Sequence, residues 1–509
     1  MIDRIIALDI PAKLYQSLDA GEEGVVYFSE GSVTEPGVTI SKYSIKDRKS
    51  TKLASGISYF YPSANGKKAL YANLGGQCFI VDAGAELKPD AKALNIADLQ
   101  MNIDPVAEYR QMFREAWRFQ RDYFYVRNVH GADMDWLWKT YSPWVESVGH
   151  REDFNYLLDI LGGETSIGHS FVGGGDFPAT QRVPVGMLGA DYEIVNGFYR
   201  FKKIYNGESW NPDAKAPLRG PGLNVKAGDY LLAVNGKPLT ANVNIYSLFD
   251  QTAGKQTMIT VNSVADLTGA KDVVVIPVSS EGGLRQYDWV ESNRRKVNEL
   301  SGGKLAYVWL PNTSNQGYSN FNRYVIAQKD KKGIIIDERY NQGGSIADYF
   351  TEFLSRQQVG YFNNPVGDKQ PFTAPDAGIW GPKVMIINEM AGSGGDYLPY
   401  SFRAMKLGPL VGTRTWGGLV GIWDVPNLID NGSITAPRGG FFNMDGEWDV
   451  ENKGVAPDYE VEEAPALIVA GHDPQLEKAV QVAMELLKAQ EVKLKPQPAD
   501  PVRVKRPAR

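Results

Sequence analysis

Short runs of alternating apolar and polar residues fill the first hundred positions, with turn residues between them. The alternation has the period of two that a half-buried strand requires. Such runs occur at 25–28, 38–43, 59–61, 69–72 and 79–81. Their close, even spacing is typical of β-meanders and propeller blades, and the stretch holds about two blades, whereas a closed propeller needs at least four. Residues 1–103 are therefore predicted to form a partial β-propeller-like piece.

A helical domain is predicted over residues 104–180. Asp104 is a good N-cap and Pro105 suits the first helical position, after which apolar and aromatic residues recur at helical spacing. Two further helical patterns follow, over 136–144 and 154–161. The segment ends in a glycine-dense stretch that carries His169.

The strand pattern returns in residues 181–282, whose centre, 222–236, reads GLNVKAGDYLLAVNG. The final Asn235-Gly236 is a strong signal for a tight turn after an apolar strand. This stretch resembles the PDZ family, in which GD-x-[IL]-[LV]-x-[IV]-[ND]-G is a core motif. The resemblance implies a module that binds extended peptide ends by strand addition.

Apolar strands alternate with helices in residues 283–490, which is the rhythm of a layered α/β core with parallel strands. Residues 491–509 are rich in proline and basic side chains, and they are expected to be disordered. The predicted fold class is multidomain α+β, with a propeller-like piece, a helical domain, a PDZ-like β domain and a layered α/β domain.

The composition narrows the classes of function. The 509 residues allow about three or four domains. The formal charge of −6 gives no positive field for nucleic acid or an acidic membrane, so neither is expected as a partner. A single cysteine, Cys78, excludes an intrachain disulfide and a cysteine-rich metal site. The four histidines lack ligand spacing, so no metal or organic cofactor is expected.

No apolar run reaches the roughly 20 residues that a membrane span needs. The first residues lack the basic start and apolar core of an export signal, which favours a cytoplasmic location. A location in the cell envelope stays open, because a truncated propeller could have lost such a signal.

Ser393 is the first candidate for catalysis. It lies in Ala-Gly-Ser-Gly-Gly-Asp, after an apolar strand and before an aromatic helix. A serine in a glycine turn at a helix start exposes its hydroxyl beside backbone N–H groups, which suits a nucleophile. An ordinary glycine-rich N-cap has the same appearance.

A serine nucleophile needs a base that is neutral near pH 7, and histidine is the usual choice. His169 lies between glycine-rich turns, whereas the other three histidines have the setting of surface residues. Two more segments could assist. Gly343 and Gly344 follow an apolar strand and could turn a backbone N–H toward an oxyanion, and Glu451 could orient a base.

Four motifs occur in order after the helical domain and PDZ-like module: Asn-x-Gly-Gly, Gly-Ser-Gly-Gly-Asp, Thr-Arg-Thr-Trp-Gly-Gly and Glu-Asn-x-Gly-Val-x-Pro-Asp. Together they resemble the tail-specific or C-terminal processing serine peptidases, and most closely the tricorn protease core. The resemblance covers about residues 1–490. It implies the end of a propeller, a helical domain holding the histidine, a PDZ domain and an α/β domain holding the nucleophile. It also implies an oligomer.

The resemblance implies a role for each motif. Ser393 corresponds to the nucleophile, His169 to the base and Glu451 to the acid. The N–H of Gly394, with that of Gly343 or Gly344, corresponds to the oxyanion hole.

Two positions depart from the family pattern. The archaeal tricorn proteases have a relay serine immediately before the histidine, where this chain has Gly168, so Ser170, Ser166 or a water is left to link the acid and the base. Gly394 stands where an aspartate is expected, which still leaves a backbone donor. The acidic residues that set a basic preference in tricorn have no evident counterpart, because residues 361–365 contain no acid.

The function predicted is a serine endopeptidase or oligopeptidase acting on peptides or unfolded chain ends. A catalytically silent PDZ-type peptide-binding scaffold is the alternative, since Gly168 removes the relay. A generic serine esterase is a third reading, and it leaves the PDZ-like insert unexplained.

Overall fold

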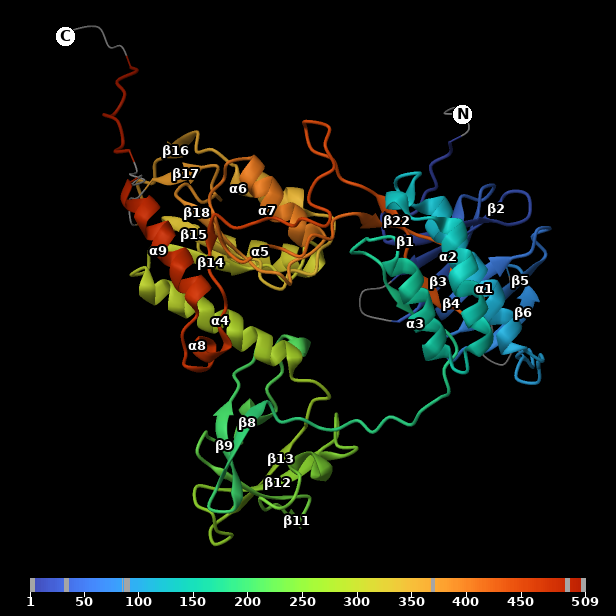
Figure 1. The fold of residues 1–509 in the computed structure, drawn as a ribbon, viewed down its shortest axis with the longest axis horizontal. Coiled ribbons are helices and arrows are strands. Elements are labelled where there is room, and N and C mark those ends of the chain that lie inside the picture. The colour runs from blue at the N-terminus through green and yellow to red at the C-terminus, as the bar shows by residue number, and fades with distance from the viewer. Residues whose placement is uncertain are drawn as a thin grey trace. The chain divides into compact units, whose positions relative to one another are not determined.

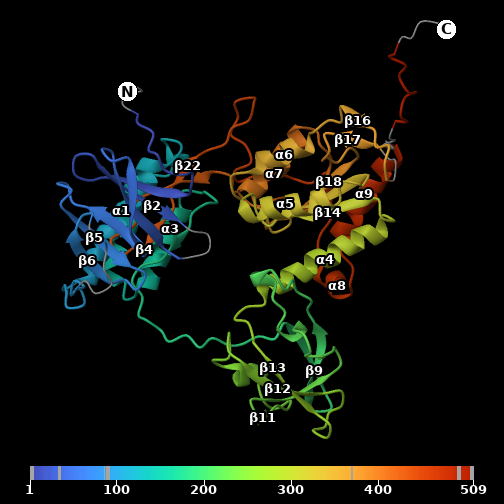
Figure 2. The same ribbon diagram turned by 180° about the vertical axis from the view of Figure 1, so that it is seen from behind.

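The computed structural model describes residues 5–31, 36–84, 86, 92–367, 371–489 and 495–504. The chain divides into two compact units, Met1–Asp104 and Pro105–Arg509. Figure 1 and Figure 2 show the chain from two opposite sides.

The first unit is a six-stranded antiparallel meander with its strands in sequence order. Its strands are β1 (Tyr15–Ala20), β2 (Val25–Gly31), β3 (Val38–Ser44), β4 (Lys49–Pro62), β5 (Lys68–Asn73) and β6 (Cys78–Asp82). All five expected runs lie in strands, and β1 is additional. The first half of β4 pairs with β3 and its second half with β5, so one long strand joins what the sequence presented as two blades into one sheet.

The second unit begins with three helices, α1 (Pro105–Tyr123), α2 (Met134–Tyr141) and α3 (Arg151–Gly163), and with the 3-10 helices η2 (Val129–Gly131) and η3 (Ser142–Ser147). The helix expected over 136–144 is thus α2 continued by a 3-10 helix that contains Pro143. Three residues from a distant segment, Leu428, Ile434 and Ala436, complete the hydrophobic core of these helices. A buried ion pair, Arg151 Nε to Asp430 Oδ2 (2.5 Å), joins the same two regions.

The PDZ-like region is a β-sheet in the order β13-β12-β10-β9-β8, with β11 also paired to β10. The strands are β8 (Ala190–Val195), β9 (Phe198–Ile204), β10 (Tyr230–Val234), β11 (Lys237–Pro238), β12 (Thr257–Asn262) and β13 (Lys271–Val275). The 3-10 helices are η4 (Pro212–Ala214), η5 (Pro217–Arg219) and η6 (Ile245–Phe249). Asn235 and Gly236 both have positive φ, 49° and 76°, as a type I′ turn requires.

The α/β region has a parallel sheet in the order β14-β15-β18-β19-β23. Its strands are β14 (Leu305–Trp309), β15 (Gly333–Asp337), β18 (Lys383–Ile387), β19 (Leu410–Gly412) and β23 (Tyr459–Glu460). Strands β14 and β15 are fully buried, which explains their unbroken apolar runs. The predicted fold class is confirmed.

The helices of this region cover both faces of its sheet (Figure 1). They are α4 (Gly282–Leu300), α5 (Asn315–Ala327), α6 (Ala347–Leu354), α7 (Gly394–Ala404), α8 (Pro465–Val469) and α9 (Pro474–Ala489). Right-handed crossovers in one direction place α5, α6 and α7 on the same face, and α4 and α9 pack together on the other. The loops at the carboxyl ends of the strands therefore gather at one edge, where ligands bind in such folds.

Short two-stranded pairings complete the second unit. They join β16 (Gly360–Phe362) to β17 (Phe372–Ala374), β20 (Gly421–Ile422) to β22 (Pro437–Gly439), and β21 (Ser433–Ile434) to β7 (Val172–Gly173). In the part of the chain that the structure describes, no helix combines the length and apolarity needed to cross a membrane. Residues 495–504 of the expected tail contain no helix or strand, and the rest of the tail lies outside the described residues.

Replacing Asp430 with Ala is expected to lower the free energy of unfolding by about 3 kcal/mol, because the Arg151 guanidinium stays buried without its carboxylate. Urea denaturation followed by tryptophan fluorescence measures the change. The control is Glu146→Ala, which removes the solvent-exposed partner of Arg110 and should leave the denaturation midpoint nearly unchanged. Equal shifts in the two variants would contradict the structural role of the buried pair.

Candidate active site

Ser393 lies at the first turn of α7, directly after β18 and its loop. Its backbone has φ 60° and ψ −117°, a strained conformation for a residue with a side chain. The glycine that follows is required by space, because a Cβ on Gly394 would lie 2.0 Å from Thr313 Oγ1 and 2.3 Å from the Gly344 oxygen. Only a glycine-rich sequence can bring the chain this close to the neighbouring loop. The result is a half-buried serine presented at a helix N-terminus.

The glycine loop after β15 touches this serine turn. A Cβ on Gly343 would lie 2.6 Å from the Ser393 Cβ. The Gly343 N–H already donates to Asn341 Oδ1 (2.9 Å). Within the described residues, the N–H groups of Gly344 and Gly394 have no protein acceptor. Of the two loop glycines that the sequence left open, Gly344 is therefore the one with a free donor.

Asp396 fastens the serine turn to the loop that follows β19. Its carboxylate accepts hydrogen bonds from the Ser393 N–H (2.9 Å), the Thr415 hydroxyl (2.5 Å), the Gly417 N–H (2.8 Å) and the Gly418 N–H (3.0 Å). Burial raises the pKa of Asp396, while these four hydrogen bonds act to lower it. The carboxylate thus fixes two segments that meet beside Ser393.

His169 is 5% exposed, whereas the other three histidines are exposed. Its ring makes edge contacts with Trp416 and Phe171. Burial lowers the pKa of His169, and the Glu451 charge and a hydrogen bond with the Val420 backbone act to raise it. The net effect lowers the pKa of His169, which favours the neutral imidazole that can accept a proton.

Glu451 holds the backbone around the histidine. Its Oε1 accepts from the Gly168 N–H (2.9 Å), and its Oε2 accepts from the N–H groups of Leu419 (2.7 Å) and Val420 (2.8 Å). No hydrogen bond joins Glu451 to the His169 ring, and the buried His169 Nδ1 has no partner. Glu451 therefore lies beside His169 and affects it through its charge and through the backbone of Gly168.

Ser170 is not brought to the base. Its buried Oγ has no hydrogen-bond partner and packs against α3, 1.9 Å from where a Cβ on Gly162 would lie. The position of Gly168 is closer to the acid, because a Cβ there would lie 3.5 Å from Glu451 Oε1. Nor does a hydrogen bond join Ser393 to His169 among the described residues. The 415–420 loop touches both residues, because Trp416 contacts the His169 ring and the Gly418 oxygen accepts from the Ser393 N–H (3.1 Å).

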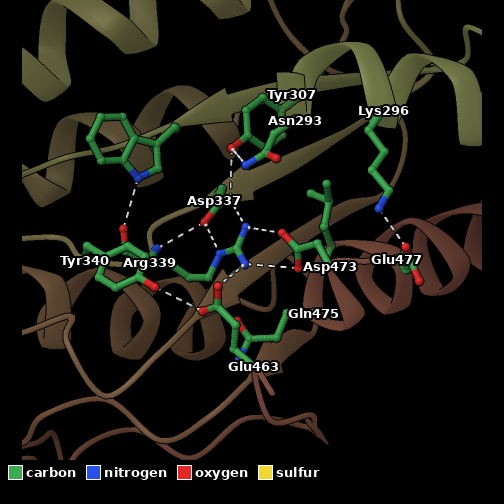
Figure 3. A network of polar contacts seen from close by, with 12 residues as sticks. Asn293, Lys296, Tyr307, Asp337, Arg339, Tyr340, Glu463, Asp473, Gln475 and Glu477 are labelled. Carbon is green, nitrogen blue, oxygen red and sulfur yellow. Dashed lines mark hydrogen bonds and ion pairs between the residues drawn. The ribbon is translucent and has the colours of Figure 1, made fainter. Parts of the chain in front are cut away.

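A buried arginine fixes the loop that carries the glycine donors (Figure 3). Arg339 is fully buried and binds Asp337 (2.7 Å) and Asp473 (3.0 Å), while its carbonyl accepts from Trp309 Nε1 (3.0 Å). Tyr340 donates to Glu463 (3.1 Å). The loop after β15 is thereby tied to the start of α9.

Comparison with known proteins shows which families the chain resembles. Three family models match: the tricorn protease C1 domain over residues 105–163, the tricorn protease PDZ domain over 186–280, and peptidase family S41 over 304–461. The crystal structure of the tricorn protease matches with a TM-score of 0.87 at 27% identity, covering 94% of this chain and 47% of that chain. The chain is similar to the tricorn proteases over most of its length. The predicted resemblance to the tricorn core and to PDZ domains is confirmed.

Two curated relatives show how much of a tricorn protease sequence this chain covers. Tricorn protease homolog 1 of Streptomyces coelicolor is 31% identical over 97% of this chain and 48% of its own length. The putative tricorn-like protease C-terminal subunit of Sulfurisphaera tokodaii is 32% identical, over 95% of this chain and 57% of its own length. The chain spans about half the length of the curated relatives it matches.

The sequence reasoning missed Asp396 and Arg339. A signal for Asp396 was present, since it stands three residues after Ser393, where a capping residue binds back to the N-cap N–H. Arg339 had no local signal, because its partner Asp473 is 134 residues away.

Asp396→Ala is expected to lower the free energy of unfolding by about 3 kcal/mol, because four donors lose their acceptor in a buried site. Chemical denaturation monitored by circular dichroism measures this. Asp159→Ala, at an exposed position of α3, is the control and should change stability little. If Asp396→Ala were as stable as Asp159→Ala, the hydrogen bonds to the Asp396 carboxylate would not contribute to stability.

Proposed function

We propose that this chain is a serine peptidase that hydrolyses peptide bonds, with Ser393 as nucleophile. The observation that carries the proposal is the strained serine at the start of α7, next to the unpaired N–H groups of Gly344 and Gly394. Such donors stabilise the oxyanion of a tetrahedral intermediate. The family names of the relatives support the same activity.

His169 is the base in this mechanism. The neutral imidazole takes the proton of the Ser393 hydroxyl as its oxygen attacks the peptide carbonyl, and the N–H groups of Gly344 and Gly394 hold the oxyanion. The imidazolium then protonates the leaving amine as the peptide C–N bond breaks, which leaves an acyl-enzyme on Ser393. A water, activated by His169, then hydrolyses the acyl-enzyme. Glu451 stabilises the imidazolium by its charge. Approach of His169 to Ser393 belongs to the substrate-bound state, because catalytic hydrogen bonds often tighten only there.

The substrates proposed are oligopeptides or the ends of unfolded chains. The PDZ-like sheet offers strand edges to which an extended peptide can add. A homo-oligomer belongs to the same proposal, because the family resemblance implies it. A cytoplasmic location is proposed as well, with the cell envelope as the alternative. The silent-scaffold alternative is less favoured, since the chain retains the nucleophile, the base, the acid and both free donors.

Ser393→Ala is expected to abolish peptide hydrolysis and covalent labelling by a fluorophosphonate. The melting temperature should change little, because loss of one hydroxyl at a half-exposed turn costs at most about 1 kcal/mol. Gel fluorescence measures the covalent labelling, and cleavage of an internally quenched peptide measures the hydrolysis. Ser170→Ala is the matched control and should still be labelled. Labelling of the Ser393→Ala protein to the same extent would remove Ser393 from the mechanism.

The pH profile tests His169. A base must be neutral to act, so kcat/KM is expected to rise with pH and to level off above the pKa of His169. Because that pKa is lowered, the midpoint should fall below the value for a free histidine, about 6.5. His169→Ala should lose activity by about a hundredfold or more. The control, His150→Ala, changes an exposed helix cap and should keep the profile. A midpoint well above 6.5, or equal losses in both variants, would contradict the assignment.

A further inference from the structure

Two half-exposed aromatic side chains flank the proposed base. Phe171 is 49% exposed and Trp416 is 42% exposed, and their rings are near parallel, with centroids 6.4 Å apart at 22°. The His169 ring meets each of them edge-on, at 5.7 Å and 5.3 Å. We name this pair, Phe171 and Trp416, the aromatic shelf.

Trp416 is fixed in place although its ring is exposed. The residues on both sides of it, Thr415 and Gly417, donate to the buried Asp396 carboxylate, and its own N–H donates to the Ala391 oxygen (2.9 Å). Its ring covers Gly392, where a Cβ would lie 2.4 Å from the ring. A bulky apolar ring held rigidly in solvent is a feature of binding surfaces.

Phe171 is held by a reciprocal pair of hydrogen bonds. Its N–H donates to Thr435 Oγ1 (2.9 Å), and its oxygen accepts from the Thr435 N–H (2.9 Å). The two rings therefore come from separate loops, each anchored by backbone contacts. Binding to such a preorganised surface loses little conformational entropy.

The position of the shelf identifies which part of a substrate it meets. In a serine peptidase the base gives its proton to the leaving amine, so the base lies on the side of the residue whose nitrogen departs. Both shelf rings contact His169. The shelf therefore faces the residue on the carboxyl side of the cleaved bond.

The charges near the shelf are already engaged. Both oxygens of Asp396 and both oxygens of Glu451 accept hydrogen bonds from other groups of the chain. These hydrogen bonds hold both carboxylates against the backbone of the 415–420 loop, so neither points freely toward a substrate side chain. An apolar or aromatic side chain fits this surface best, because it gains ring contacts without leaving a charge unpaired.

We propose that the aromatic shelf selects substrates with an aromatic or large apolar residue immediately after the cleaved bond. This inference rests on the proposed peptidase function. It assigns Phe171 and Trp416 as specificity-determining residues and names the substrate class that the site takes.

Four internally quenched peptides that differ only in the residue after the cleaved bond, Phe, Leu, Lys or Glu, test the proposal. We expect kcat/KM for Phe to exceed that for Glu or Lys by about tenfold, the scale of one aromatic contact. Phe171→Ala and Trp416→Ala should each reduce this ratio toward one, and Trp416→Phe should retain most of it. Trp136→Ala, an exposed ring in the helical region, should keep the full ratio.

A preference for Lys at this position, or an unchanged ratio in both alanine variants, would overturn the proposal. So would a preference that depends on the residue before the cleaved bond instead. A binding measurement distinguishes failure of the shelf proposal from failure of the peptidase function. Fluorescence anisotropy of the same peptides, labelled, on the intact Ser393→Ala chain should show tighter binding of the Phe peptide, and adding Phe171→Ala should remove the difference. Equal binding of all four peptides would contradict the shelf even if hydrolysis is absent.

Discussion

The buried charge of Arg339 is the constraint on which the α/β region depends. A guanidinium without solvent is tolerated only when carboxylates surround it, and here Asp337 from the end of β15 and Asp473 from the start of α9 supply them. The Tyr307 hydroxyl completes the group by donating to Asp337 (2.9 Å). Because each partner would be left with an unpaired charge, the strand, the helix and the loop between them must form together.

Glu338, next to Arg339 in the chain, is another buried ionisable side chain. It is fully buried, and neither of its carboxyl oxygens has a hydrogen-bond partner. Burial raises the pKa of Glu338 well above its usual range, and the negative charges of Asp396 and Asp337 add to this effect. These effects favour the protonated, neutral form of the Glu338 side chain. Arg339 and its two aspartates can form a charge cluster at the sheet edge without a further buried anion.

Two other carboxylates assemble the site at that edge. Asp396 binds the first half of the 415–420 loop and Glu451 binds its second half, at Leu419 and Val420. Through Ser393 and Gly168 they also bind the serine turn and the histidine loop. The six residues 415–420 thus connect the serine turn to the histidine loop and fix the positions of both.

Local signals were sufficient for part of this picture. The glycine turn at Ser393, the strand before Gly343 and the turn at Asn235-Gly236 each express a backbone requirement within a few residues, so the sequence predicts them. Strand β1 was missed because its residues are largely exposed and lack a clear alternation.

The rest depends on partners far apart in the chain. No residue close to Arg151 in the sequence indicates that it forms a buried ion pair with Asp430. No residue close to Ser170 in the sequence indicates that its hydroxyl packs against Gly162. The choice between Gly343 and Gly344 also needed coordinates, because it depends on which N–H Asn341 has already engaged.

The contacts of Glu451 have a consequence for how the protein folds. The Gly168 N–H and the carboxylate that receives it are 283 residues apart, and the Thr435 contact with His169 spans 266. Closing loops of this size is slow, since the chain entropy is lost before the contact forms. During synthesis the loop that carries His169 leaves the ribosome long before Glu451 does, and domains emerging first fold first. Glu451 can bind the Gly168 N–H only after residue 451 has emerged, so a partly made chain holds His169 without the carboxylate beside it.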